Sequence, residues 1–281
     1  MKDTTRIPIQ RWQQGAGAKD DSDDLVVEEP LEIRVGGRSV SVTMRTPGQD
    51  DELAAGFLLS EGLLRSRADV LEIAPEWMRD ECNIVDVRLA DGVTFDFESL
   101  SRHVFASSSC GVCGKASIES VHLHFPPIAC DARVAAATLL RLPERLGQGQ
   151  EAFKRTGGLH AAALFDLDGN LVVLREDVGR HNAVDKVLGY GLLNERLPFD
   201  RHVLLVSGRA SFEIMQKALA GRIPIVAAVS APSSLAVQFA EDSGQTLVGF
   251  LREERMNVYA GQYRIAFAST AGQPVSRSTS S

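Results

Sequence analysis

The chain has few cysteines and no long apolar run. Its 281 residues include only four cysteines, too few for the disulfide framework that staples small secreted proteins. No stretch approaches the ~18 consecutive apolar residues that a membrane-spanning helix needs. The polar start Met1-Lys2-Asp3 is not followed by the apolar region of a secretion signal. We therefore expect a protein of the reducing cytoplasm that makes no membrane contact.

Basic residues are outnumbered by acidic ones. Thirty Lys and Arg face 37 Asp and Glu, which gives a net charge of -7. Because nucleic acids and anionic membranes attract basic surfaces, this balance favours neither as a partner. Any anionic ligand would need a local basic site. The 44% share of hydrophobic residues is ordinary for a globular core at this length.

The common nucleotide-binding motifs are missing. A phosphate-binding P-loop needs a glycine five residues before its Gly-Lys pair, but Ser109 stands there before Gly114-Lys115. Ala116 occupies the place of the Ser or Thr that should follow. The run Gly189-Tyr190-Gly191 lacks the third glycine of a dinucleotide fingerprint and falls in an expected helix. Dinucleotide-dependent redox chemistry is therefore disfavoured.

Zinc motifs are incomplete as well. Cys82 and Cys130 are isolated, so no second Cys-x-x-Cys completes a four-cysteine site. A zinc deaminase combines His-x-Glu with a later Pro-Cys-x-x-Cys. Here His160-Ala161-Ala162 has alanine in place of the glutamate, and the cysteine pair comes earlier and lacks the proline. We therefore expect no metal site.

What the sequence does contain is one Cys-x-x-Cys pair in small, polar surroundings. Cys110 and Cys113 lie between Ser107 and Lys115, with Val112 as the one bulky apolar neighbour. Two thiols at this spacing can share a metal, close into a disulfide or pass sulfur. Backbone amides and a nearby cation lower a thiol pKa, and the thiolate is the nucleophile. We expect Lys115 and the amides of Gly111 and Gly114 to supply that field here. We predict that both cysteines are catalytic rather than buried structural residues.

The first half of the chain predicts a leader and a small α+β region. Residues 1–28 are polar and acidic, so we expect them to be poorly ordered. Apolar residues alternate on both sides of Gly36-Gly37, which predicts a hairpin over 31–44. A helix is expected from Asp50 or Asp51 to Arg65, followed by two strands, 83–89 and 93–97. Residues 29–130 thus form an N-terminal α+β region ending in the Cys-x-x-Cys loop.

The second half predicts an α/β domain over residues 131–268. Its apolar strands are nearly continuous, which is typical of strands buried on both faces. We expect a three-layer α/β/α sandwich with a parallel or mixed sheet and right-handed crossovers. Residues 269–281 are expected to be a disordered tail. The expected helices are 132–146 and 180–193, and the expected strands are 159–165, 171–174, 203–206, 223–229 and 246–250.

Polar loops follow three of these strands. They span Ser207–Ser211, Ser230–Ser234 and Arg252–Arg255, at the strand ends where open α/β sheets bind ligands. Two of them lead into helices, whose N-terminal amides attract anions, and Arg209 suits a phosphate. For Ser211 and Ser233 a simple N-cap role remains open.

Two histidines are further candidates. His160 opens an expected strand, where it is either structural or a hydrogen-bonding group of the site. His181 lies in the dense polar run Glu176–Asn182, which holds more polar groups than a solvated helix cap requires.

Together these motifs resemble the formate dehydrogenase accessory sulfurtransferase family (FdhD-type proteins). The resemblance covers residues 28–265, and the joint order of the motifs makes it specific. They are Cys110–Gly114, Gly158 with His160–Ala162, Glu176–Lys186, Ser207–Glu213, Val229–Pro232 and Thr246–Phe250.

The resemblance implies a fold and an activity. The main domain would be a sandwich like the cytidine deaminase fold that has lost its zinc chemistry, in a cytoplasmic homodimer. The family takes persulfide sulfur from a cysteine desulfurase and transfers it to the bis-molybdopterin guanine dinucleotide form of the molybdenum cofactor. That cofactor, carried as cargo, then serves formate dehydrogenase. On this basis Cys110 carries the persulfide and Cys113 assists.

The resemblance also implies where the cofactor binds. The family's cofactor segment maps onto Phe250, Leu251, Arg252, Glu253, Glu254 and Arg255. Ser207 and Arg209 are expected to join it. Glu253 and Glu254 depart from the more basic, glycine-containing version of this segment in many relatives.

Two other functions remain open. A non-catalytic carrier would bind the molybdenum cofactor through the loops after the strands and hand it on without using Cys110. A metal-binding regulatory module would use both cysteines and His160.

Overall fold

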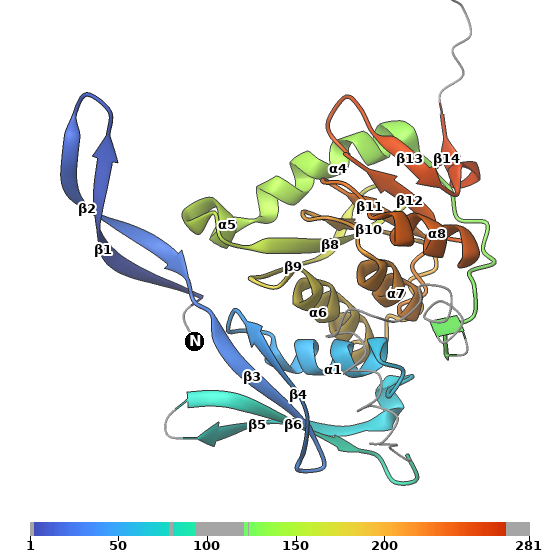
Figure 1. Ribbon diagram of the computed structural model, residues 1–281. Helices are drawn as coiled ribbons and strands as arrows, with labels where there is room; N and C mark the ends of the chain where they lie inside the picture. Colours follow the sequence, from blue (N-terminus) through green and yellow to red (C-terminus); the bar gives the residue numbers. More distant parts are fainter. Residues whose placement is uncertain (1–2, 79–80, 94–120, 123, 268–281) are drawn as a thin grey trace, which may run out of the picture.

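The computed structural model describes residues 3–78, 81–93, 121–122 and 124–267. Figure 1 shows three parts: a long hairpin, a small sheet beside helix α1, and a layered domain of sheet and helices.

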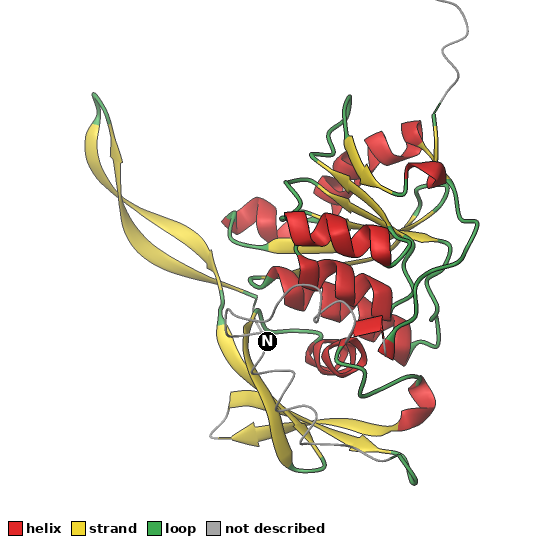
Figure 2. Ribbon diagram, turned by 45° about the vertical axis from the view of Figure 1, so that its right-hand side comes forward, coloured by secondary structure: helices red, strands yellow, loops and turns green. Residues whose placement is uncertain are grey.

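The N-terminal hairpin corrects the expectation of a poorly ordered leader. β1 (Thr4–Gln13) and β2 (Gly17–Val26) pair antiparallel over their whole length. Arg6 donates to Ser22 at 2.8 Å and Arg11 pairs with Asp21 at 2.9 Å, so cross-strand contacts offset part of the acidic charge. The hairpin projects away from the other parts, as Figures 1 and 2 show.

The small sheet has the strand order β4-β3-β6-β5. Its strands are β3 (Glu29–Val35), β4 (Arg38–Arg45), β5 (Val70–Met78) and β6 (Glu81–Leu89). The hairpin β3–β4 is confirmed, whereas β5 was not expected. Helix α1 (Asp50–Ser60) ends before Arg65, because the chain turns at Gly62 with a φ of 77°. The expected strand 93–97 lies almost entirely outside the described residues.

The layered domain is built on a six-stranded mixed sheet of order β13-β12-β11-β10-β8-β9. The neighbours β10, β11 and β12 are parallel, and the other pairings are antiparallel. The mixed sheet is therefore confirmed, and β13 was missed. The strands are β8 (His160–Asp166), β9 (Leu171–Asp177), β10 (His202–Val206), β11 (Ile225–Ala228), β12 (Thr246–Gly249) and β13 (Asn257–Ala260).

Helices cover both faces of this sheet, which makes three layers (Figure 1). Alternate residues of each strand point to opposite sides: Leu204 belongs to one buried apolar cluster, and Leu205 to another. One face carries α4 (Ala136–Gly149) and α5 (Glu151–Thr156); the other carries α6 (Arg180–Leu193), α7 (Phe212–Ala220) and α8 (Ser234–Asp242). The likeness to the cytidine deaminase fold stays a prediction.

Short elements complete the fold. They are the turns η1 (Arg67–Asp69) and η2 (Gln262–Arg264) and the paired strands β7 (Val134–Ala135) and β14 (Ile265–Ala266). Among the described residues, no helix combines the length and apolar character needed to span a membrane.

Helix α1 joins the small sheet to the layered domain by packing closely on α6. A Cβ built on Gly56 would lie 1.8 Å from the carbonyl oxygen of Asp185, and one on Gly189 would lie 1.8 Å from that of Glu52. The two helix backbones therefore touch where each has a glycine. The strands and helices of both parts contribute to one buried apolar cluster.

Candidate functional site

The sheet topology brings the sequence-predicted loops to one edge. β10, β11 and β12 run parallel, so the loops that follow them all leave from the same side. β8 is antiparallel to β10, so it begins at that side, and β9 ends there because His160 pairs with Asp177. We call this side the strand edge.

Backbone contacts join the three loops of the strand edge. The amide of Ala210 donates to the carbonyl of Ala231 at 3.2 Å, and Ala210 forms a bridge with Pro232. The amide of Phe250 donates to the carbonyl of Ser230 at 3.1 Å. The loops therefore form one continuous surface, as the succession of strands predicted.

The polar residues predicted in the first two loops differ in their contacts and in their exposure to solvent. The hydroxyl of Ser207 accepts from the amide of Ala161 at 2.9 Å, so it extends the pairing of β8 with β10. Arg209 is exposed. Ser233 caps α8 by accepting from the amide of Ala236 at 3.2 Å, while Ser211 begins α7 without such a bond. The N-cap interpretation is confirmed for Ser233.

The segment 250–255 combines anchors with exposed groups. Leu251 is fully buried and its amide donates to the carbonyl of Ala228, so it anchors the segment to the core. Phe250 is 41% exposed and adopts a φ of 50°, which turns the chain sharply. Arg252 donates to the carbonyls of Val229 and Leu251. Glu253, Glu254 and Arg255 are exposed.

A second group of polar residues lies at the other end of this edge. The ring of His160 and the stem of Arg180 both lie against Gly208, where a Cβ would be 3.3 Å from His160 Nδ1 and 3.7 Å from Arg180 Cδ. Burial, followed by the charges of Arg180, His181 and Arg209, holds the pKa of His160 below its usual range. The neutral form of His160 is therefore favoured over the charged form.

His181 connects the first turns of α6 and α7. Its Nε2 lies 2.8 Å from a carboxylate oxygen of Glu213 and 3.3 Å from the hydroxyl of Ser211. The hydrogen bond from His181 lowers the pKa of Glu213. The polar run Glu176–Asn182 is therefore bonded to α7 through His181 and Glu213.

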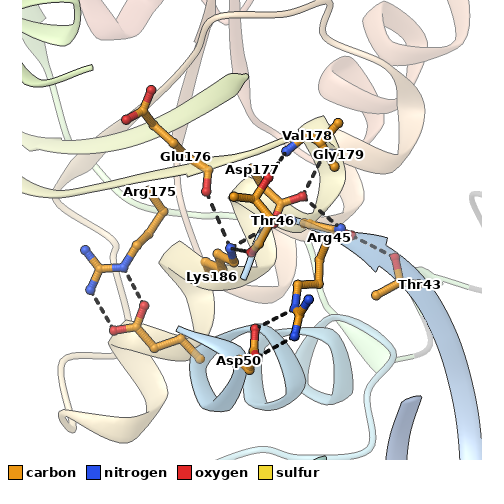
Figure 3. Close-up of polar contacts among 12 residues, drawn as sticks. Thr43, Arg45, Thr46, Asp50, Arg175, Glu176, Asp177, Val178, Gly179 and Lys186 are labelled. Carbon is orange, nitrogen blue, oxygen red and sulfur yellow. Dashed lines mark hydrogen bonds and ion pairs between the residues drawn. The ribbon is translucent and has the colours of Figure 1, made fainter. Parts of the chain in front are cut away.

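The same run holds a buried carboxylate, shown in Figure 3. Asp177 is fully buried and pairs with the Lys186 ammonium at 2.8 Å. Its other oxygen accepts from the amide of Gly179 at 2.8 Å and from the side chain of Asn182 at 3.0 Å. The carboxylate therefore holds the turn that presents Arg180 and His181.

The N-terminal region supports this turn. The amide of Thr46 donates to Asp177 at 3.2 Å, and the Thr46 hydroxyl accepts from the amide of Val178 at 3.2 Å. The carbonyl of Thr46 accepts from Lys186 at 3.0 Å (Figure 3). The sequence did not predict this role of Thr46, because nothing near Thr46 in the sequence indicates a partner 131 residues away.

The two predicted catalytic cysteines, Cys110 and Cys113, lie outside the described residues. Cys130 is described, and its Sγ donates to the carbonyl of Asp200 at 3.6 Å, just before β10 and so opposite the strand edge. Within the described ranges, no three His, Cys, Asp or Glu side chains gather in a way that could hold a metal ion.

Comparisons with known proteins give a consistent result. The model of the FdhD/NarQ family matches residues 26–266. The chain is 57% identical over 248 residues to the sulfur carrier protein FdhD of Mycolicibacterium paratuberculosis, covering 86% of this chain and 91% of the relative. It is 52% identical over 282 residues to the sulfur carrier protein FdhD of Streptomyces coelicolor, covering 96% and 98%.

A solved structure agrees with these relatives. The crystal structure of a formate dehydrogenase accessory protein from Desulfotalea psychrophila superposes with a TM-score of 0.75 at 27% identity, over 94% of this chain and 100% of that one. Because the family model spans the small sheet and the whole layered domain, the chain belongs to the FdhD/NarQ family.

Proposed function

We propose that this protein is a sulfur carrier that takes persulfide sulfur from a cysteine desulfurase and delivers it to a guanine-dinucleotide molybdenum cofactor for formate dehydrogenase. The observation that carries the proposal is its close similarity to curated sulfur carrier proteins over nearly the full chain. The Cys-x-x-Cys pair supplies the thiols that such chemistry needs.

The chemistry divides into loading and release. In loading, the Cys110 thiolate attacks the outer sulfur of the donor's persulfide, the donor S–S bond breaks, and its electron pair leaves with the donor cysteine as a thiolate. In release, the Cys113 thiolate attacks the inner sulfur of the Cys110 persulfide and expels hydrosulfide. The resulting Cys110–Cys113 disulfide needs a dithiol reductant before the next cycle.

The strand edge is the proposed binding surface for the cofactor, which is the substrate here. Ser207, Arg209 and the segment 250–255 lie on this surface, next to the carboxyl ends of the parallel strands. Arg209 and Arg255 are exposed cations that suit phosphates, while the buried side chain of Leu251 fixes the segment in place. From the family resemblance we also propose a cytoplasmic homodimer.

Intact-mass spectrometry tests the loading step. The protein is incubated with a cysteine desulfurase and cysteine, and we expect an adduct of about 32 Da on a thiolate nucleophile. Cys110→Ala should abolish the adduct without unfolding the protein. Cys130→Ala is the matched control and should keep it, because Cys130 does not belong to the Cys-x-x-Cys pair and its Sγ donates to the carbonyl of Asp200. An adduct of equal yield on Cys110→Ala would refute the catalytic role of Cys110.

A non-catalytic cofactor carrier is the second candidate, favoured by a polar strand edge whose three loops, 207–211, 230–234 and 250–255, contact one another and contain no cysteine. Reactivation of formate dehydrogenase in cells that lack the native protein separates the two. A sulfur carrier with Cys110→Ala fails to restore formate oxidation, whereas a simple cofactor carrier with the same change restores it.

A further inference from the structure

The hairpin of β1 and β2, which we call the arm, has no core of its own. Within the described chain its strands pair only with each other, and they project away from the other parts (Figures 1 and 2). The arm is attached at its base, where the Val27 amide donates to the Asp3 carbonyl and Asp3 pairs with Arg155. The match to the family model begins only at residue 26. Because an isolated two-stranded ribbon is marginally stable in water, the arm needs a surface to cover it.

One face of the arm carries three aliphatic side chains. Successive residues of a strand alternate between faces, so Ile7 and Ile9 of β1 share a face. Thr5 opposes Leu25, which places Leu25 on the same face. Ile7 is 36% exposed and Leu25 is 41% exposed. We call this side the aliphatic face; exposed apolar surface of this kind, with polar groups around it, is typical of a contact with another protein.

The layered domain of the same chain approaches the other face of the arm. Val26 belongs to that other face, and its Cγ1 lies 3.0 Å from where a Cβ on Gly158 would be. The aliphatic face is therefore turned away from this contact and is open to a second molecule.

Charge on the aliphatic face changes sign along the arm. Near the base, Asp23 is exposed on this face. At the centre, Ile9 opposes Asp21, and near the tip Arg11 opposes Lys19. Arg11 also pairs with Asp21 at 2.9 Å, whereas Lys19 is exposed. The aliphatic face is therefore basic near its tip and acidic near its base, with an isoleucine between.

The edges of the arm are unsuited to pairing with another strand. Pro8 interrupts the row of amide donors in β1, and proline is one of the residues that protect exposed sheet edges. Two copies of β2 side by side would bring together the run Asp20–Asp24, which holds four aspartates in each copy. Like charges on neighbouring strands are destabilising. A face of the arm, rather than an edge, is therefore the surface for contact.

We propose that the arm binds the arm of a second copy of this chain, with the aliphatic faces together and the arms antiparallel. A two-fold axis then passes close to Ile9, and the base of each arm lies on the tip of the other. Asp23 of each copy lies near Lys19 of the other, so the attraction is made twice. A parallel arrangement would place Asp23 against Asp23, which is why charge selects the antiparallel one.

The size of the arm sets the strength of this contact. Each partner in a standard interface contributes about 20 to 30 residues, whereas the arm has two strands of ten residues and presents half of them on one face. We therefore expect reversible association in the micromolar range. The contact names a surface that the family resemblance does not, and it does not depend on the sulfur chemistry.

Sedimentation velocity of the full-length protein over a range of concentrations tests the charge arrangement. Asp23→Lys and Lys19→Glu should each raise the dissociation constant about tenfold or more, because each sets like charges against each other across the two arms. An equimolar mixture of these two variants should associate as tightly as the wild type, because the facing charges are opposite again. Asp20→Lys, on the other face of the arm, is the matched control and should leave association largely unchanged.

Disulfide cross-linking tests the faces directly, whatever other surfaces the two copies share. Ile9→Cys should form a cross-linked dimer under mild oxidation, because the two copies of this position meet at the axis. Gln10→Cys is the matched control on the other face and should not. The wild type gives the background from its four native cysteines. All these changes lie outside the buried core, so the thermal midpoint should stay close to that of the wild type.

Several results would overturn the proposal. A wild type that stays monomeric at all concentrations, or a dimer that no arm variant weakens, removes the contact. Weaker association of both charge variants without rescue in their mixture shows that the arm binds a different surface. Equal cross-linking of Ile9→Cys and Gln10→Cys contradicts the assigned face. The sulfur-loading assay is read separately: association through the arm without a sulfur adduct refutes the sulfur-carrier function and leaves this contact intact.

Discussion

Asp177 shows how one buried carboxylate sets the geometry of the strand edge. Its oxygens accept from the Lys186 ammonium, the side chain of Asn182 and the amides of Thr46 and Gly179. Those donors come from the segment after β4, from the turn before α6 and from α6 itself. Since Arg180 and His181 follow that turn directly, their position depends on this buried group.

Replacing this carboxylate should be costly. Asp177→Asn leaves Lys186 buried without its anionic partner, so we expect the free energy of unfolding to fall by about 3 kcal/mol or more, measured by guanidinium denaturation. The double variant Asp177→Asn with Lys186→Met removes both charges and should recover a large part of the loss. Equal instability of the single and double variants would contradict the ion-pair explanation.

Because the pKa of His160 is lowered in the folded protein, the free energy of unfolding should depend on pH. Burial and then the neighbouring cations lower its pKa below the usual 6.5, so the unfolded chain binds the proton more readily than the folded one. The free energy of unfolding should therefore fall as pH drops through 6.5 and should be fully restored above it. His160→Gln should reduce this loss, measured by thermal unfolding at about pH 7.5 and about pH 5.5.

A second histidine, His202, contributes to the same pH dependence of stability. Burial lowers the pKa of His202 as well, so the pH slope should shrink in His160→Gln without vanishing. His202 lies at the start of β10, away from the strand edge, and His202→Gln is the matched variant. An identical slope in wild type and His160→Gln would show that His160 does not titrate below its ordinary value.

Helices α1 and α6 cross so closely that each requires glycine at the contact. In Gly189→Ala the new Cβ would lie 1.8 Å from the carbonyl oxygen of Glu52, which is backbone and has no rotamer to change. We expect the free energy of unfolding to fall by about 3 kcal/mol or more, or the protein to fail to fold. Gly147→Ala in α4 is the control, because no other part of the described chain, the backbone of α4 itself apart, comes within 4 Å of its Cβ.

The same glycine-to-alanine change should act in opposite directions at the two sites. At Gly147 the helix gains about 0.5 to 1 kcal/mol, since alanine loses less backbone entropy there and meets no other part of the described chain. Chemical denaturation of both variants measures the contrast. A similar small effect at both positions would show that α1 and α6 can separate without cost.

Elements with a strong local signal were predicted well. The helix over 180–193 and the hairpin around Gly36-Gly37 match the structure, because periodicity and turn residues specify them locally. The hairpin β1–β2 was mistaken for a poorly ordered leader, since its acidic composition hides cross-strand partners such as Arg11 and Asp21. Strands β5 and β13 were missed, since edge positions relax the apolar alternation on which the prediction depends.

The small sheet and the layered domain share one core. Leu31 and Ile33 of β3, Leu53 of α1 and Val184 and Val187 of α6 all belong to the same buried cluster. Buried polar groups also connect the two parts, since Lys217 of α7 donates to Ser60 of α1 at 2.9 Å. An interface of this kind is a core rather than a contact between independent domains.

The whole molecule should therefore unfold in one cooperative step. Native-state hydrogen exchange should give the slowest amides of β3 and β6 nearly the same opening free energy as those of β10 and β11. Circular dichroism and fluorescence should follow coincident denaturation curves. A lower opening free energy confined to β3 and β6 would show that the small sheet unfolds alone, against the shared core.

The sequence by itself determined the local pattern: the Cys-x-x-Cys spacing of Cys110 and Cys113, the buried strands of the α/β sheet, and the polar loops after them. Only the tertiary structure decided which polar groups meet, placing His160 and Arg180 together against Gly208 and tying Asp177 to Thr46. The reason is physical. Periodicity and turn residues act over a few positions, whereas burial, unpaired charge and close helix contact depend on residues that the sheet topology brings together across the chain.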